Sequence, residues 1–181
     1  MILIITIILV VAILLGITTF FVYRNIKDDD YIDAEDVLAE QEANVWLNEH
    51  NRIRAEVGQA PVTWNEEMAK GAKDHANYCQ FSHSDKQYRK LGDTTLGENL
   101  GFGSPYDLYS DKKMMGLWES EKMHYQHPQY PSQSETGETG HYTQIVNKNV
   151  SEIGCACSQC NGSKLCVCRY NPIQMSNEYP Y

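Results

Sequence analysis

Positive charge is scarce in this sequence, which has 15 Lys and Arg residues against 24 Asp and Glu and a formal net charge of −9. Surfaces that bind nucleic acids need clustered basic side chains to neutralise phosphates. The chain has no basic stripe of that kind, so we expect no nucleic-acid partner. It also lacks the Gly-Lys-Ser or Gly-Lys-Thr of a phosphate-binding loop.

Charged side chains are entirely absent from Met1–Tyr23, the first 23 residues. At about 1.5 Å per residue, a helix of this length crosses a hydrocarbon core of about 30 Å. A cleaved signal peptide would show a basic start, a shorter apolar region and small residues before the cut, and this run ends in aromatic residues instead. We therefore expect a transmembrane signal-anchor over 1–23, with a signal peptide as the alternative.

An acidic stem, residues 24–36, links this run to one domain, residues 37–181, which is long enough for a single core. All six cysteines lie in the domain: Cys79, Cys155, Cys157, Cys160, Cys166 and Cys168. An even number behind an apolar leader indicates disulfides and an oxidising compartment. We expect the domain to be extracellular or lumenal on a membrane anchor, or secreted, and a viral envelope is a further setting.

A structural zinc site is the rival use of the cysteines. Cys157-Ser158-Gln159-Cys160 has ligand-like spacing. A structural zinc site usually pairs two such turns, and Cys166-Val167-Cys168 has the spacing of a strand instead. We therefore favour disulfides over a zinc site on these cysteines.

Helix patterns are predicted over three stretches. The first begins between residues 33 and 36 and stops at Gly58. The second begins at Asn65 and places its apolar residues on one face as far as Cys79. The third covers about 110–124.

Strand patterns are predicted over 143–146, 152–158 and 165–170. The last two pair across Asn161-Gly162, a dipeptide typical of a type I′ hairpin turn. This register places Cys157 opposite Cys166 and Cys155 opposite Cys168. Position alone leaves the disulfide connectivity open.

Several segments, taken together and in this order, resemble one family. They are Asn48-Glu49-His50-Asn51-Arg52-Ile53-Arg54, Cys79-Gln80-Phe81-Ser82-His83-Ser84, Gly97-Glu98-Asn99-Leu100, Trp118-Glu119, Gly140-His141-Tyr142-Thr143-Gln144, Ile153-Gly154-Cys155-Ala156 and Cys168-Arg169-Tyr170-Asn171-Pro172. The set resembles the CAP superfamily of cysteine-rich secretory proteins, antigen 5 and pathogenesis-related type one proteins, from about Glu42 to Pro172. Departures include Asn147, where the family usually has Trp, and no Cys-rich module follows the domain.

The resemblance implies an α+β fold, a three-layer α-β-α sandwich with a small antiparallel sheet. It implies the disulfides Cys79–Cys155 and Cys160–Cys168, which leaves Cys157–Cys166 as the third pair. It also implies that His83, Glu98, Glu119 and His141 line a central cavity.

Two imidazoles and two carboxylates form a reasonable reversible zinc site, with His83 and His141 as ligands. Glu98 and Glu119 would either ligate the metal or fix the tautomer of each histidine. The alternative is a hydrogen-bonded polar network that binds nothing.

The function that the resemblance implies is non-enzymatic, namely binding of a lipid or sterol or of a protein partner, with the membrane reached through the N-terminal helix. The alternative is a metal-dependent hydrolase, in which Glu119 or Glu98 is the base and His141 the acid.

Overall fold

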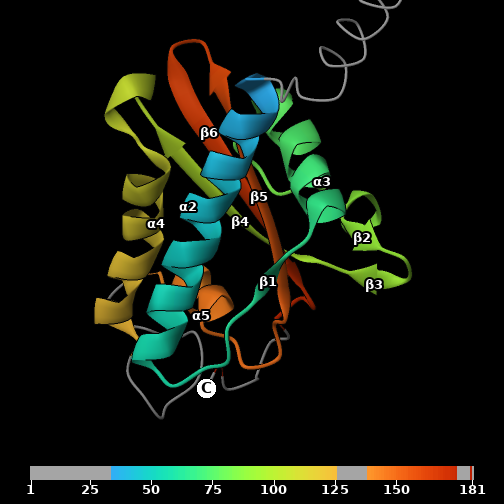
Figure 1. Cartoon of the computed structure of the whole chain (residues 1–181), viewed down its shortest axis with the longest axis vertical. Helices are drawn as coiled ribbons and strands as arrows, with labels where there is room; N and C mark the ends of the chain where they lie inside the picture. Colours follow the sequence, from blue (N-terminus) through green and yellow to red (C-terminus); the bar gives the residue numbers. More distant parts are fainter. Residues whose placement is uncertain (1–33, 126–137, 175–179, 181) are drawn as a thin grey trace, which may run out of the picture. The chain divides into compact units, whose positions relative to one another are not determined.

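The computed structural model describes residues 34–125, 138–174 and 180 (Figure 1). The expected membrane span, 1–23, and most of the stem lie outside this part of the chain. Within it, no helix combines the length and the apolar character needed to cross a bilayer. The chain divides into two compact units, Met1–Ala39 and Glu40–Tyr181. The described part of the first unit is the beginning of helix α2 (Ala34–Glu56).

The second unit is built on a four-stranded sheet with the order β1-β5-β6-β4. Its strands are β1 (Thr63–Trp64), β4 (Gly97–Gly103), β5 (Glu152–Cys160) and β6 (Ser163–Asn171). Strands β5, β6 and β4 are antiparallel, and β1 joins β5 in parallel. A separate hairpin pairs β2 (Lys90–Leu91) with β3 (Thr94–Thr95). Strand β4 lies at one edge of the sheet, and this position organises the candidate site.

Helix α3 (Glu66–Asn77) covers one face of the sheet (Figure 1). Asn65 caps it by accepting a hydrogen bond from the backbone N–H of Met68 at 3.1 Å, as the sequence predicts for a helix that begins there. Ala72 and Ala76 pack against Leu100 and Val167 in the core of this face. The helix lies so close to β5 that a Cβ on Gly154 would collide with its backbone.

Helices α2, α4 (Asp111–Ser120) and α5 (Gly140–Ile145) bury their apolar side chains in the core on the opposite face. Three short 3₁₀ helices complete the described elements: η1 (Lys86–Tyr88), η2 (Tyr106–Leu108) and η3 (Glu121–His124). The third predicted helix is therefore α4 extended by η3. The arrangement is a mixed α/β fold with a helix layer on each side of a small sheet, as expected.

The strand predicted over 143–146 is wrong, because these residues belong to α5 and its C-terminal end. Their β-branched side chains favour a strand locally. The carboxylate of Glu121 instead accepts the backbone N–H groups of His141 and Tyr142, and burial of Tyr142 and Ile145 holds the helix in the core. Tertiary contacts therefore override local propensity here.

The β5–β6 hairpin forms in the predicted register. Asn161 and Gly162 have φ values of +51° and +79°, as a type I′ turn requires. Cys157 faces Cys166, and these two form one disulfide, as expected.

The predicted pairs Cys79–Cys155 and Cys160–Cys168 are wrong, since the bridges are Cys79–Cys160 and Cys155–Cys168. Cys155 and Cys168 are direct cross-strand neighbours with Cα atoms 4.1 Å apart, on the face that carries α2 and α4. Side chains alternate along a strand, so Cys160 points to the α3 face, where its Sγ lies 3.7 Å from the Ala76 carbonyl. Cys79, just after the end of α3, is the partner within reach.

Candidate functional site

His141 lies at the start of α5 and is held by a carboxylate from the end of α4. Its Nδ1 lies 2.5 Å from Oε1 of Glu121. The other oxygen of Glu121 accepts the backbone N–H groups of His141 at 2.9 Å and Tyr142 at 3.1 Å. Trp118 stacks on the imidazole with ring centroids 5.9 Å apart and an angle of 13° between the planes. The ring is therefore fixed in position, and its side chain is still 23% exposed.

Glu138 brings a second carboxylate to this place. Ligand-type atoms of Glu121, Glu138 and His141 all lie within 4.8 Å of one another. One imidazole and two carboxylates are donors that zinc and other divalent transition metals accept. These three side chains are the described residues best suited to hold a metal ion.

His83 is held by a different glutamate. Its Nδ1 lies 2.8 Å from Oε1 of Glu98, which also accepts the backbone N–H of Ser84. The second oxygen of Glu98 accepts from the Ser84 hydroxyl at 2.9 Å and pairs with Arg169 at 3.2 Å. Burial raises the pKa of Glu98, but the hydrogen bond from His83 and the charge of Arg169 outweigh it and leave the pKa below its usual value.

Glu98 has no acceptor capacity left for a metal. A carboxylate offers about four lone-pair positions, and His83, both groups of Ser84 and Arg169 fill them. Its side chain has no exposed surface, whereas that of His83 is 57% exposed. Because the carboxylate can only accept, it fixes His83 with a proton on Nδ1 and leaves Nε2 available on the open side.

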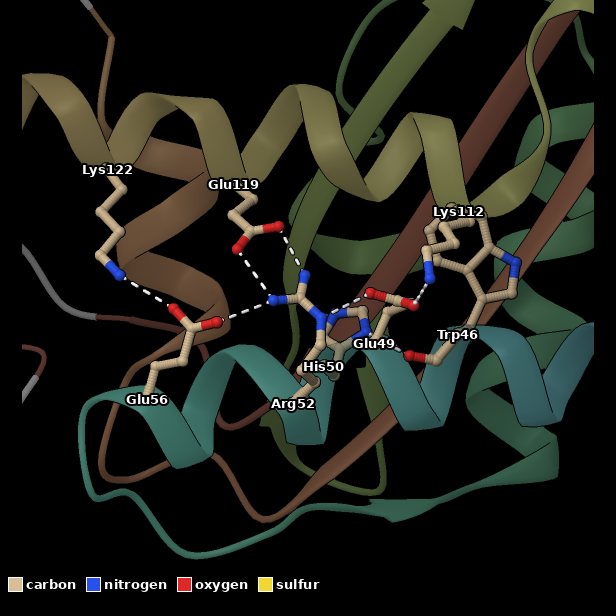
Figure 2. Close-up of polar contacts among 8 residues, drawn as sticks. All are labelled: Trp46, Glu49, His50, Arg52, Glu56, Lys112, Glu119 and Lys122. Atoms are coloured by element: carbon tan, nitrogen blue, oxygen red, sulfur yellow. Dashed lines mark hydrogen bonds and ion pairs between the residues drawn. The ribbon is translucent and has the colours of Figure 1, made fainter.

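Glu119, the second acid predicted for the cavity, is directed to α2 instead (Figure 2). Its two oxygens accept from Nη1 and Nη2 of Arg52 at 3.0 and 2.5 Å. Arg52 also pairs with Glu49 and Glu56 at 2.8 Å each. The structure therefore gives Glu119 a role in joining α4 to α2, and every contact it records for this carboxylate is with Arg52.

The two histidine–carboxylate pairs lie at the same end of β4 but on opposite faces of the strand. Leu100 packs toward α3, and alternation directs Glu98 to the same face. Asn99 points to the other face, where its Nδ2 donates to the His141 carbonyl at 3.1 Å and to the Tyr170 hydroxyl at 3.0 Å. The four predicted residues thus lie in three separate contacts: His83 with Glu98, Glu119 with Arg52, and His141 with Glu121. None of the candidate metal groups among the described residues contains His83 or Glu98.

Glu121 and Glu138 were not selected from the sequence as site residues. Glu121 follows Trp118 by three positions, and such residues share one side of a helix. That spacing is the signal that distinguishes Glu121 from Glu119. Glu138 has no comparable local signal.

The remaining candidate metal groups contain cysteines. His50 lies near Cys155 and Cys168, and Asp111 lies near Cys157 and Cys166. These cysteines form disulfides and no cysteine is free. A cysteine binds zinc only as a thiolate, so these two groups are not metal sites in the oxidised protein.

Comparison with known proteins shows which family the chain is similar to. Residues 47–170 match the model of the cysteine-rich secretory protein family, called CAP. Pathogenesis-related protein 1C of Nicotiana tabacum is 36% identical over 132 residues, which cover 70% of this chain and 73% of the tobacco protein.

Solved structures show the same fold. Venom allergen-like protein 4 of Schistosoma mansoni is 28% identical, with a TM-score of 0.64 over 77% of this chain and 93% of that one. NaASP2, crystallised with Zn²⁺, is 25% identical, with a TM-score of 0.66 over 84% and 88% of the two chains. From its sequence, fold and relatives, the chain belongs to the CAP family of cysteine-rich secretory proteins.

Proposed function

We propose that this protein is an extracytoplasmic CAP domain that reversibly binds a divalent metal ion, such as zinc, through His141, Glu121 and Glu138. The observation that carries the proposal is the convergence of their three ligand-type atoms within 4.8 Å. A relative crystallised with Zn²⁺ supports it.

The surroundings of His141 prepare it for this role. Oε1 of Glu121 faces Nδ1, so an ion bound between them would take the place of the proton on that nitrogen and have both atoms as ligands. The stacked Trp118 restricts rotation of the ring. Glu121 uses three of its acceptor positions on Nδ1 and two backbone N–H groups, so one position is open to an ion. A bound ion would supply a fixed positive charge beside two carboxylates.

Family membership supports a proposal for the wider role. We propose that the domain acts outside the cytoplasm by binding a lipid, a sterol or a protein partner, with residues 1–23 as a membrane anchor. A metal-dependent hydrolase at the same residues is the alternative. A panel of ester and peptide substrates, assayed with and without a chelator, separates the two.

Isothermal titration of the folded domain with zinc tests the metal site. We expect His141→Ala to weaken binding by more than the ~10–100-fold that loss of an orienting partner costs. Glu121→Gln should also weaken it by more than that range, because Glu121 is a ligand in this proposal. Glu119→Gln is the matched control. It removes the same charge from a carboxylate that lies two residues from Glu121 and contacts Arg52 instead.

His83→Ala distinguishes this site from one shared by both histidines. Unchanged affinity is expected, because His83 belongs to none of the candidate groups among the described residues. Equal zinc affinity for the wild type and His141→Ala would refute the proposal.

A further inference from the structure

A small pocket opens on the α3 face of the sheet, away from the proposed metal site. Its wall includes Arg169 of β6, Arg89 and Lys90 beside and within β2, and Glu67 and Gly71 of α3. The pocket therefore places three cationic side chains against one carboxylate. All of them lie in the second compact unit.

Arg169 lines this pocket and carries donors that have no partner among the described residues. The residue is only 2% exposed. Its Nη2 pairs with Glu98 at 3.2 Å, while Nε and Nη1 are buried and have no hydrogen-bond partner in the described part of the chain. Nε of Arg89 is also buried and, within the same residues, has no partner.

Leaving charged donors buried without acceptors is costly, because each has given up its hydration. Glu98 offsets part of that cost for Arg169, but its acceptor positions are already filled. Burial lowers the pKa of Arg169, Glu98 raises it, and the charge of Arg89 lowers it again. The two guanidinium groups therefore repel each other across a space where an acceptor with negative charge would pair with both.

The size of the pocket limits the ligand. It leaves about 30 Å³ for the centres of water-sized groups, and a single water needs ≳10–15 Å³ by this measure. That space suits one small ion or the end of a larger molecule and is far too small for a sterol. Water alone would supply acceptors without balancing the charge.

We propose that this pocket binds a tetrahedral oxoanion, a phosphate or sulfate group, between Arg89 and Arg169, with Lys90 at the entrance. Guanidinium groups match such oxoanions through paired N–H donors. The group arrives either as a free ion or as the terminal ester of a larger ligand. This site is separate from the metal site and does not depend on it.

Amide chemical shifts measured during titration with inorganic phosphate or sulfate, at constant ionic strength, test the proposal. Saturable shifts are expected at Gly71, Leu91 and Leu96, which line the pocket. Arg89→Gln should weaken binding about tenfold or more, the effect of losing a charged hydrogen bond. Glu67→Gln should tighten binding, because it removes the one carboxylate of the wall.

Lys86→Gln is the matched control, since it removes one exposed positive charge from the same segment outside the pocket. A parallel titration with glucose 6-phosphate separates the two sources: tighter binding than inorganic phosphate identifies an ester ligand, and weaker or absent binding identifies the free ion. Arg89 is used because Arg169 variants risk unfolding. Absence of saturable shifts with all three probes, or equal affinities for Arg89→Gln and Lys86→Gln, would overturn the proposal.

Discussion

The two histidine–carboxylate pairs use the same residue types and yet differ in what they can do. Glu98 and Glu121 each accept from Nδ1 of an imidazole. Glu98 is wholly enclosed, and all of its acceptor positions are used by groups of the protein. The Glu121 side chain is 12% exposed, and one of its acceptor positions remains open. The surroundings therefore make Glu98 a structural anchor and make Glu121 a candidate ligand.

The two carboxylates also differ in what they stabilise. Glu98 balances the buried charge of Arg169 and fixes the segment that carries His83. Glu121 accepts the second and third backbone N–H groups of α5, which makes it the tertiary equivalent of an N-cap. Losing the first leaves a buried charge unpaired, whereas losing the second leaves two neutral backbone donors without this acceptor.

The largest difference between the two pairs is expected when each carboxylate is replaced by alanine. Glu98→Ala is expected to destabilise the fold by about 3–5 kcal/mol, the cost of an unpaired buried charge. Glu121→Ala should cost about 0.5–2 kcal/mol, as for a lost helix cap. Urea denaturation with the disulfides intact measures both. Equal losses of unfolding free energy would contradict the different roles assigned to the two carboxylates.

His50 is a third case, a buried imidazole held without a carboxylate. Its nitrogens contact the Trp46 carbonyl at 2.8 Å and the Tyr170 hydroxyl at 2.9 Å. The pKa of His50 is lowered from 6.5 to about 4, chiefly by burial, with the hydrogen bond to Trp46 opposing the shift and the charge of Arg54 adding to it. Between about pH 6.5 and pH 4, His50 therefore binds a proton in the unfolded chain but not in the folded protein.

Stability should accordingly fall as the pH drops from about 6.5 to about 4, by a total of about 3 kcal/mol from this residue. Above that window His50 is neutral in both states and contributes no pH dependence. The measurement is the free energy of unfolding against pH for the wild type and His50→Gln. Parallel curves for the two proteins would show that the pKa of His50 is the same in the folded and unfolded states.

The smallest effect is expected at the exposed network of Figure 2. Arg52 pairs with Glu49, Glu56 and Glu119, but its side chain is 42% exposed. Exposed ion pairs contribute about 0.2–1 kcal/mol each and are screened by salt. Arg52→Gln should therefore lower the free energy of unfolding by about 1 kcal/mol at low ionic strength and by less in high salt. A loss as large as that of Glu98→Ala would place this network among the buried anchors.

Local signals in the sequence were enough to predict most of the framework. Asn65 as a cap and Gly58 as a stop mark helix ends, and Asn161-Gly162 fixes the hairpin and its register. Helix α5 could not be predicted this way, because Glu121 provides its cap from another element. Its sequence taken alone favours a strand.

The candidate site was harder to predict, because each error concerned which way a side chain points. Glu119 and Glu121 are two positions apart on one helical segment, and that offset directs one to Arg52 and the other to His141. The cysteine pairs failed for the same reason. Cys155 and Cys160 belong to opposite faces of β5, and only the packing of α3 shows that Cys79 lies near Cys160.

The bridge Cys79–Cys160 closes a covalent ring, since the two residues are 81 positions apart, whereas the other two bridges lie within the hairpin. His83, Glu98, Glu121, Glu138 and His141 all belong to the ring. A protease that cuts the backbone once anywhere inside it releases no fragment, because the sulfur bond still holds both pieces. A nicked molecule outside the cell would thus keep its site residues tethered, and it would separate into two bands on a gel only after reduction.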